Sequence, residues 1–235
     1  MFTGIVEGMA RIEAIVPHGA AFRFGLDLGP VVEGLKIGDS VAVEGACLTV
    51  VTLRGTKAEF DVIRETVERT AFATLRTGQR VNVERPMRAD GRFHGHLVSG
   101  HVDGTGRVKV KRQEAGQTWF TVEVPRRLTS FMVEKGSVTL GGVSLTLTEV
   151  TETTFSVALI PHTLQVTTLG QKSEGDLINV EIDQLAKFVH KLLGAYLPKE
   201  EQETGEEGEV KLLRPGAALG LTIEHLKRTG FASES

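Results

Sequence analysis

Two pairs of small polar side chains occupy matching places in the sequence. In GACLTV, Cys47 and Thr49 lie two residues apart, and in GVSLTL, Ser144 and Thr146 repeat that spacing. Residues two apart on a β-strand point to the same face, so each pair would place a thiol or hydroxyl beside a second hydroxyl. A single such pair is usually structural, because threonine is common on sheets and a lone cysteine is usually a small buried residue. Its recurrence in both halves predicts two equivalent pockets.

Three histidines, His94, His96 and His101, lie close together in FHGHLVSGH. The H-x-H spacing on a strand would direct two imidazoles to one face, as metal sites in small barrels require. A carboxylate or fourth ligand at useful spacing is missing, so hydrogen-bonding roles are favoured and we predict no metal centre. The sequence also has no GxSxG elbow, P-loop or GxGxxG fingerprint, which leaves hydrolase and nucleotide-binding functions without support.

An internal repeat covers most of the chain. A shift of 97 residues aligns GDSVAVEGACLTVV (38–51) with KGSVTLGGVSLTLT (135–148), and VNVE (81–84) with INVE (178–181). A shift of 96 places TGIVEG (3–8) over SGHVDG (99–104), so that Ile5 corresponds to His101. Matches in this order and number predict a duplicated domain.

Each repeat has the pattern of short strands. SVAVEG, CLTVV, AEFDVI and RVNVE alternate or run apolar with β-branched residues, and Gly-containing turns separate them. We therefore predict an all-β fold of two small closed barrels, one over residues 1–97 and one over 98–183. Residues 65–75 could form a short helix.

The apolar residues of QLAKFVHKLLGAYL recur at helical spacing, which predicts a helix over 184–197. Its apolar stripe fits an oligomer contact or packing onto its own barrel about equally well. Residues 198–235 begin with a Glu-rich run that is typical of a solvated linker, followed by a tail to which we assign no function.

The composition is that of a soluble globular protein, with 40% hydrophobic and 24% charged residues and a mean hydropathy of -0.02. Residues 199–235 hold five Lys/Arg against eight Asp/Glu, which leaves the rest of the chain nearly neutral. We therefore expect no binding to nucleic acid or to a membrane. With a single cysteine and no signal peptide, the expected location is the cytoplasm.

The motifs MFTGIVEG, GACLTV, ETVERT, GHLVSGHVDG, GVSLTLTEV, IPHTLQVTTLG and NVEID, in this order and spacing, resemble the riboflavin synthase α-chain family. The resemblance spans residues 1 to about 195. It implies two six-stranded Greek-key barrels, each binding one 6,7-dimethyl-8-ribityllumazine without a cofactor. It also implies a homotrimer formed through the C-terminal helix, with the active site between the first barrel of one chain and the second barrel of its neighbour. Lumazine synthase is a candidate partner.

The resemblance also implies two sets of binding residues. The first pocket would use Gly4, Ile5, Val6, Cys47, Leu48, Thr49, Asp61, Val62, Ile63, Arg64, Glu65 and Thr66. The second would use Gly100, His101, Val102, Lys135, Ser144, Leu145, Thr146, Ala158, Leu159, Ile160, Pro161, His162 and Thr163. Ser40 and Asp183 match further positions near the reaction centre. Two departures from the family pattern, Glu44 and Ala46, remove none of these groups.

The family reaction transfers a four-carbon unit between two identical lumazines and yields riboflavin. The C7 methyl of the lumazine is acidic because the resulting anion is delocalised, so a modest base suffices and the protein mainly orients both rings. We expect His101, Ser144 and Thr146 to handle protons at one ring, and Cys47 with Ser40 to bind or activate the other.

Three other functions fit parts of the sequence. A lumazine-binding antenna protein would hold one chromophore without turnover, but the second repeat has as complete a contact set as the first. A structural barrel module would leave the repeated polar pairs unexplained. A flavin oxidoreductase would need a nicotinamide domain that the chain lacks.

Overall fold

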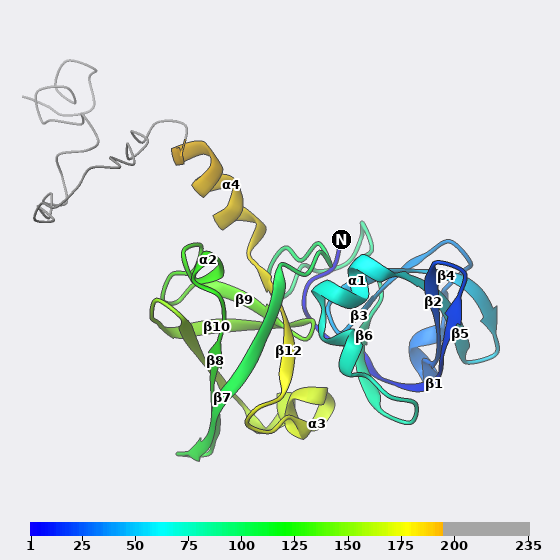
Figure 1. The fold of residues 1–235 in the computed structure, drawn as a ribbon, viewed down its shortest axis with the longest axis horizontal. Helices are drawn as coiled ribbons and strands as arrows, with labels where there is room; N and C mark the ends of the chain where they lie inside the picture. Colours follow the sequence, from blue (N-terminus) through cyan, green and yellow to red (C-terminus); the bar gives the residue numbers. More distant parts are fainter. Residues whose placement is uncertain (195–235) are drawn as a thin grey trace, which may run out of the picture. The chain divides into compact units, whose positions relative to one another are not determined.

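The computed structural model describes residues 1–194 and contains two closed β-barrels, as the sequence predicts (Figure 1). All strand pairs are antiparallel. Around the first barrel the strands follow the order β1-β2-β5-β4-β3-β6. They are β1 (Gly8–His18), β2 (Ala21–Asp27), β3 (Ser40–Val43), β4 (Ala46–Arg54), β5 (Lys57–Ile63) and β6 (Arg80–Glu84).

The second barrel has the same topology, with the order β7-β8-β11-β10-β9-β12 when read from β7. Its strands are β7 (Gly104–Glu114), β8 (Gln117–Glu123), β9 (Ser137–Leu140), β10 (Val143–Val150), β11 (Thr154–Leu159) and β12 (Leu177–Ile182). Closure pairs the first strand of each barrel with the last, so neither barrel exposes a free sheet edge.

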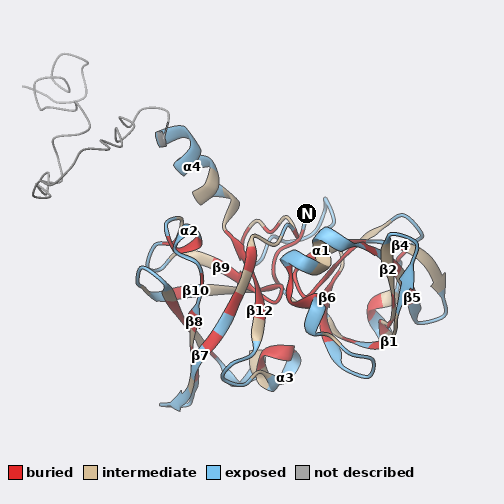
Figure 2. Ribbon diagram, in the orientation of Figure 1, coloured by how far each residue is buried: buried red, intermediate tan, exposed pale blue. Residues whose placement is uncertain are grey.

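Each barrel has its own hydrophobic core. Phe24 and Phe60 fill the first and Phe120 and Phe155 fill the second, and all four rings are at most 1% exposed. Strand β5 shows why these sequences form barrel walls, since its residues alternate between buried and more exposed positions. Figure 2 shows this inside-outside pattern of burial along the strands.

The helical segments are short. The helix expected near 65–75 is divided into α1 (Arg64–Arg69) and the 3-10 turn η2 (Ala71–Thr74). Thr70 is extended between them, and its hydroxyl donates to the Thr66 carbonyl at 2.6 Å and accepts from the Phe72 N–H at 3.2 Å. The second repeat has the same arrangement in α3 (Pro161–Val166) and η3 (Thr168–Gln171), and η1 (Gly29–Val32) and α2 (Arg126–Thr129) complete the set before the C-terminal helix.

The C-terminal helix α4 (Gln184–Gly194) confirms the predicted helix as far as residue 194. Five apolar side chains on it are at least 51% exposed, namely Leu185, Phe188, Val189, Leu192 and Leu193. Residues 195–197 of the predicted helix, and the expected acidic tail 198–235, lie outside the described residues. Within residues 1–194, no helix is long and apolar enough to cross a membrane.

The two barrels meet at their β3-β4 and β9-β10 hairpin turns. Glu44-Gly45 and Gly141-Gly142 all have positive φ, as two-residue hairpin turns of type I′ require. A Cβ on Gly45 would lie 2.8 Å from the Gly142 nitrogen, and a Cβ on Gly142 would lie 2.8 Å from the Gly45 nitrogen. The turns therefore pack backbone against backbone, which explains why the repeat keeps both glycines.

The asparagines of the VNVE and INVE motifs join the barrels symmetrically. The Asn82 side chain donates to the Gly141 carbonyl at 2.8 Å and accepts from the Thr168 N–H at 2.7 Å. Asn179 donates to the Glu44 carbonyl at 2.8 Å and accepts from the Ala71 N–H at 2.6 Å. Each asparagine thus binds a turn and a 3-10 segment of the other barrel.

Glu44 departs from this symmetry, because Gly141 occupies its place in the second repeat. Its buried Oε1 accepts from the Asn82 N–H at 2.7 Å and from the Thr168 hydroxyl at 2.9 Å. A Cβ on Gly141 would lie 2.9 Å from Glu44 Oε2, so the carboxyl group takes the space that a side chain at position 141 would need. Burial raises the pKa of Glu44, and its two hydrogen bonds and nearby Lys172 oppose that shift only in part.

Candidate active site

The glycine segments that precede β1 and β7 each cross to the other barrel. The Ser144 N–H donates to the Gly4 carbonyl at 2.8 Å, and the Cys47 N–H donates to the Gly100 carbonyl at 2.8 Å. Val6 packs against the core of the second barrel and Val102 against the core of the first. Each polar strand therefore meets the crossing segment of the other repeat.

This exchange corrects the expected grouping of the two pockets. Residues 4–6 lie beside Ser144 rather than Cys47, and residues 100–102 lie beside Cys47 rather than Ser144. The grouping was wrong because the repeat alignment identifies equivalent residues within each half. It cannot tell whether a terminal segment packs on its own barrel or on the neighbouring one.

Both contacts need glycine at the crossing point. Gly4 has φ +75°, and a Cβ there would lie 2.6 Å from the Ser144 Cβ. Gly100 has φ +81°, and a Cβ there would lie 2.7 Å from the Cys47 Cβ. The left-handed conformation and the close approach both exclude a larger residue.

Two buried glutamates that the sequence analysis did not single out hold these segments. Glu84 Oε1 accepts from the N–H and the hydroxyl of Thr3 at 2.6 and 2.8 Å, and Oε2 accepts from the Gly4 N–H at 3.0 Å. Glu181 does the same with Ser99 at 2.7 and 2.6 Å and with Gly100 at 3.0 Å. The repeated Val-Glu at the ends of VNVE and INVE was the signal for them.

A cavity of about 200 Å³ opens beside Cys47, and we call it the first-barrel pocket. Residues from both repeats line it: Ala46, Cys47, Ile63, Glu65, Thr66, Arg69, Thr70, Gly100, His101 and Val102. Seven of these are predicted site residues. Within one chain His101 therefore lies beside Cys47 and not beside Ser144. Its predicted shared role with Ser144 and Thr146 at one ring stays a prediction.

A different histidine contacts Ser144. His96 Nδ1 lies 2.7 Å from Ser144 Oγ, and His96 Nε2 lies 3.2 Å from the Thr139 hydroxyl. His96 is only 8% exposed, and burial lowers its pKa although Asp183 and Glu181 oppose the shift. A neutral imidazole bonded to a hydroxyl can accept its proton, so His96 and Ser144 form a candidate proton-transfer pair.

The other predicted residues occupy equivalent places in the two repeats. Ser40 pairs with Thr49 across β3 and β4, as Ser137 pairs with Thr146 across β9 and β10. Leu48 is buried in the first core, and Leu145 packs against the second. Asp61, Val62 and Ile63 end β5 and lead through Arg64 into α1, while Ala158 and Leu159 end β11 and lead through Ile160 into α3 with Pro161, His162 and Thr163.

Lys135 and Asp183 each have a distinctive backbone role. Lys135 is exposed and has φ +65° at the place where the first repeat has Gly38. A lysine in that conformation is uncommon. Asp183 Oδ1 accepts from the Leu185 N–H at 2.9 Å at the start of α4.

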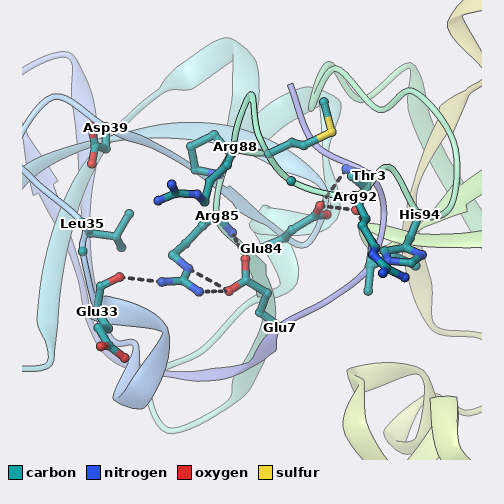
Figure 3. A pocket seen from close by; sticks show the side chains of 15 residues that line it. Thr3, Glu7, Glu33, Leu35, Asp39, Glu84, Arg85, Arg88, Arg92 and His94 are labelled. Carbon is teal, nitrogen blue, oxygen red and sulfur yellow. Dashed lines mark hydrogen bonds and ion pairs between the residues drawn. The ribbon is translucent and has the colours of Figure 1, made fainter.

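A second cavity, of about 680 Å³, has neither polar pair in its lining. Figure 3 shows Arg85 between Glu7 and the Glu33 carbonyl. Arg85 Nη2 lies 2.6 Å from Glu7 Oε2, and Nη1 donates to the Glu33 carbonyl at 2.5 Å. Glu84 also lines this cavity, and Ile5 is the only predicted site residue in its lining. His94 lies at its wall, and within residues 1–194 no group of three or more His, Cys, Asp or Glu residues could hold a metal ion.

The fold and the paired sites define a protein with two lumazine-binding domains, since the family described as "Lumazine binding domain" matches residues 3–86 and 99–183. Structures of LumP with 6,7-dimethyl-8-(1'-D-ribityl) lumazine and with riboflavin align with TM-scores of 0.70 and 0.71 at 25% and 26% identity. In both cases the alignment covers 77% of this chain and 99% of LumP.

Curated relatives identify the family within this class. Riboflavin synthase of Actinobacillus pleuropneumoniae is 35% identical, over 98% of this chain and all of the relative. Riboflavin synthases of Bacillus subtilis and Escherichia coli are 38% and 39% identical, over 87% and 88% of this chain and 95% and 99% of their own lengths. The chain belongs to the riboflavin synthase family.

Proposed function

We propose that this protein converts two molecules of 6,7-dimethyl-8-ribityllumazine into riboflavin and 5-amino-6-(ribitylamino)uracil. One lumazine gives up a four-carbon unit and the other accepts it. The two products together contain every atom of the two substrates, so the transfer needs no outside oxidant or reductant. Membership of the riboflavin synthase family supports this reaction.

The observation that carries the proposal is the reciprocal exchange of segments between two lumazine-binding barrels. Cys47 of the first barrel carries a thiol, and Ser144 of the second barrel carries a hydroxyl. Each of these residues lies against a glycine of the other repeat. The two places are equivalent in backbone and different in chemistry, because Cys47 lies near His101 and Ser144 bonds to His96. This combination fits a reaction in which two identical substrates act as donor and acceptor.

In this proposal His96 accepts a proton through Ser144 and so assists removal of a proton from the C7 methyl of one lumazine. The resulting carbanion attacks the second lumazine, which the protein holds in reacting orientation. The proposed groups around the rings remain His101, Cys47, Ser40 and Thr146. Asp183, which directly precedes α4, is a further proposed residue near the reaction centre.

The remaining proposed substrate contacts are the residues expected from the family. They are Gly4, Ile5, Val6, Lys135, Leu145, Ala158, Leu159, Ile160, Pro161, His162 and Thr163 for the second barrel. For the first barrel they are Leu48, Thr49, Asp61, Val62, Ile63, Arg64, Glu65, Thr66, Gly100 and Val102. These sets assign residues 4–6 to the second barrel and residues 100–102 to the first barrel.

We further propose that three chains associate through α4. Its exposed Leu185, Phe188, Val189, Leu192 and Leu193 form an apolar stripe of the kind that subunit contacts bury. Such a trimer would allow a first barrel and a second barrel from neighbouring chains to bring their lumazines together. The cytoplasmic location, the association with lumazine synthase and the domain limits 1–97, 98–183, 184–197 and 198–235 stay predictions.

The test is to mix the purified full chain with ribityllumazine and to follow absorbance as riboflavin forms. Turnover supports the proposal, and Ser144→Ala should lower the rate by about 10²-fold or more if proton transfer passes through this hydroxyl. Bound, fluorescent lumazine without turnover would instead indicate an antenna protein. Absence of binding would contradict both functions.

A further inference from the structure

The two glutamates that hold the crossing segments each act across the boundary between the barrels. Glu84 ends β6 of the first barrel, but the segment that it binds contacts Ser144 of the second barrel. Glu181 lies in β12 of the second barrel, but the segment that it binds contacts Cys47 of the first. Each pocket wall is therefore fixed from the opposite barrel.

The hydrogen bonds continue from each carboxylate to the next residue of the crossing segment. The Thr3 hydroxyl donates to Glu84 at 2.8 Å and accepts from the Ile5 N–H at 3.2 Å. The Ser99 hydroxyl donates to Glu181 at 2.6 Å and accepts from the His101 N–H at 3.2 Å. The backbone of His101 is thus connected to Glu181 through one hydroxyl group.

The geometry requires two acceptor oxygens on each of these side chains. Both oxygens of Glu181 accept hydrogen bonds, and two of the three donors are backbone N–H groups that cannot reverse their direction. A glutamine would place an NH2 group against one of those donors. Loss of a buried acceptor leaves an N–H without a partner, which is more harmful than loss of a contact at the surface.

We propose that Glu181 is the positioning residue for the pocket at Cys47 and that Glu84 is the positioning residue for the site at Ser144. Neither side chain needs to touch a lumazine, because each one sets the place of a backbone segment that does. This inference rests on the proposed function only in taking the lumazine as the ligand. The reciprocal assignment itself follows from the contacts of the protein.

The chain contains one cysteine, which makes the first-barrel pocket separately measurable. Cys47 is half-buried in that pocket, and its thiol can be titrated with the disulfide reagent 5,5′-dithiobis(2-nitrobenzoic acid). The reaction rate without ligand reports how firmly residues 99–102 cover the thiol. The decrease in rate with added ribityllumazine reports occupancy of the same pocket.

Glu181→Gln should raise the rate of Cys47 modification and weaken protection by ribityllumazine about tenfold, equivalent to roughly 1.4 kcal/mol. Glu84→Gln should leave both Cys47 measurements at the wild-type values and lower turnover, because it disturbs the site at Ser144. Glu149→Gln, on the exposed surface of β10, is the matched control for a change of charge.

Ser99→Ala and Thr3→Val provide a milder pair if a glutamine variant fails to fold. Each removes only the hydroxyl that links the glutamate to the next backbone N–H. Ser99→Ala should change Cys47 reactivity, and Thr3→Val should not. The proposal would be overturned if Glu181→Gln and Glu84→Gln, or Ser99→Ala and Thr3→Val, had equal effects on Cys47. It would also be overturned if only Glu84→Gln or Thr3→Val affected Cys47.

The same experiment separates this inference from the proposed function. If ribityllumazine fails to protect Cys47 in the wild-type protein, the proposed ligand is wrong. The ligand-free modification rates of the four variants would still support or overturn the positioning roles.

Discussion

The Ser144 N–H donates a 2.8 Å hydrogen bond to the carbonyl of Gly4, although the two residues belong to different repeats. The Cys47 N–H makes the equivalent bond to Gly100. Because of this reciprocal pairing, neither half of the chain supplies all the groups around its own polar strand. A duplicated sequence thereby builds two sites that share a backbone plan and differ in their side chains.

Gly100→Ala should weaken ligand binding at the first-barrel pocket. The left-handed backbone conformation costs an alanine about 1–2 kcal/mol. The added Cβ would also lie 2.7 Å from the Cys47 Cβ, which forces the crossing segment away from β4. We expect the affinity for ribityllumazine, measured by fluorescence titration, to fall about tenfold or more.

Gly116→Ala is the control for this change. Gly116 has φ +78°, but a Cβ there would have no atom within 4 Å. This variant should share the backbone strain and keep the affinity for the lumazine. Equal losses of affinity in both variants would show that contact with Cys47 is unimportant.

His96 should make the protein less stable in acid. Burial lowers the pKa of His96 in the folded chain, whereas in the unfolded chain the ring titrates near its ordinary value of 6.5. As the pH falls below that value the unfolded state binds more protons, so stability that is fully present above it declines. His96→Gln should reduce the fall in melting temperature between about pH 7 and pH 5. The exposed His162→Gln variant should behave as wild type; an unchanged profile in His96→Gln would contradict this account.

Glu44 should have the opposite effect on stability. Burial raises its pKa in the folded chain, so the folded state holds the proton at pH values where the unfolded carboxyl has lost it. The resulting stability is present below the unfolded pKa and declines as the pH rises toward the folded pKa. Glu44→Gln keeps an acceptor for Asn82 and Thr168 and removes this titration. Its melting temperature should depend less on pH on the alkaline side of 4.5, and a dependence as steep as that of wild type would refute the prediction.

The α4 stripe should control the oligomeric state. Phe188 and Leu192 are 56% and 65% exposed, so a charge at either position should prevent a neighbouring chain from burying the stripe. Sedimentation measurements should give a trimer for wild type and a monomer for Phe188→Glu and Leu192→Glu. Lys191→Glu, on the same helix, should stay trimeric. A monomeric wild-type protein would contradict the proposed association.

The barrels could be predicted from the sequence because strand alternation and the repeat agree. Phe60 and Phe155 are buried inside their barrels, as the alternation of apolar residues along their strands predicts. The C-terminal helix followed equally from its apolar spacing. The break at Thr70 was less accessible, because it depends on hydrogen bonds from the threonine side chain that propensity alone does not specify.

The residue types at the two sites could be predicted, but which residues come together at each site was harder to predict. The alignment shows that Gly4 corresponds to Gly100, but a local pattern contains no information on which barrel each segment joins. His96 was noted only as one of three clustered histidines, because it lies between the repeats and has no counterpart that could connect it with Ser144. Glu84 and Glu181 look like ordinary strand ends until the donors from Thr3 and Ser99 are seen around them.

The most direct test of the central claim is the stoichiometry of ribityllumazine turnover by the purified full chain, measured by separating and quantifying both products. The account predicts one riboflavin and one 5-amino-6-(ribitylamino)uracil for every two lumazines consumed, with no added cofactor. Riboflavin formed in any other ratio, or lumazine that stays bound and unchanged, would contradict it.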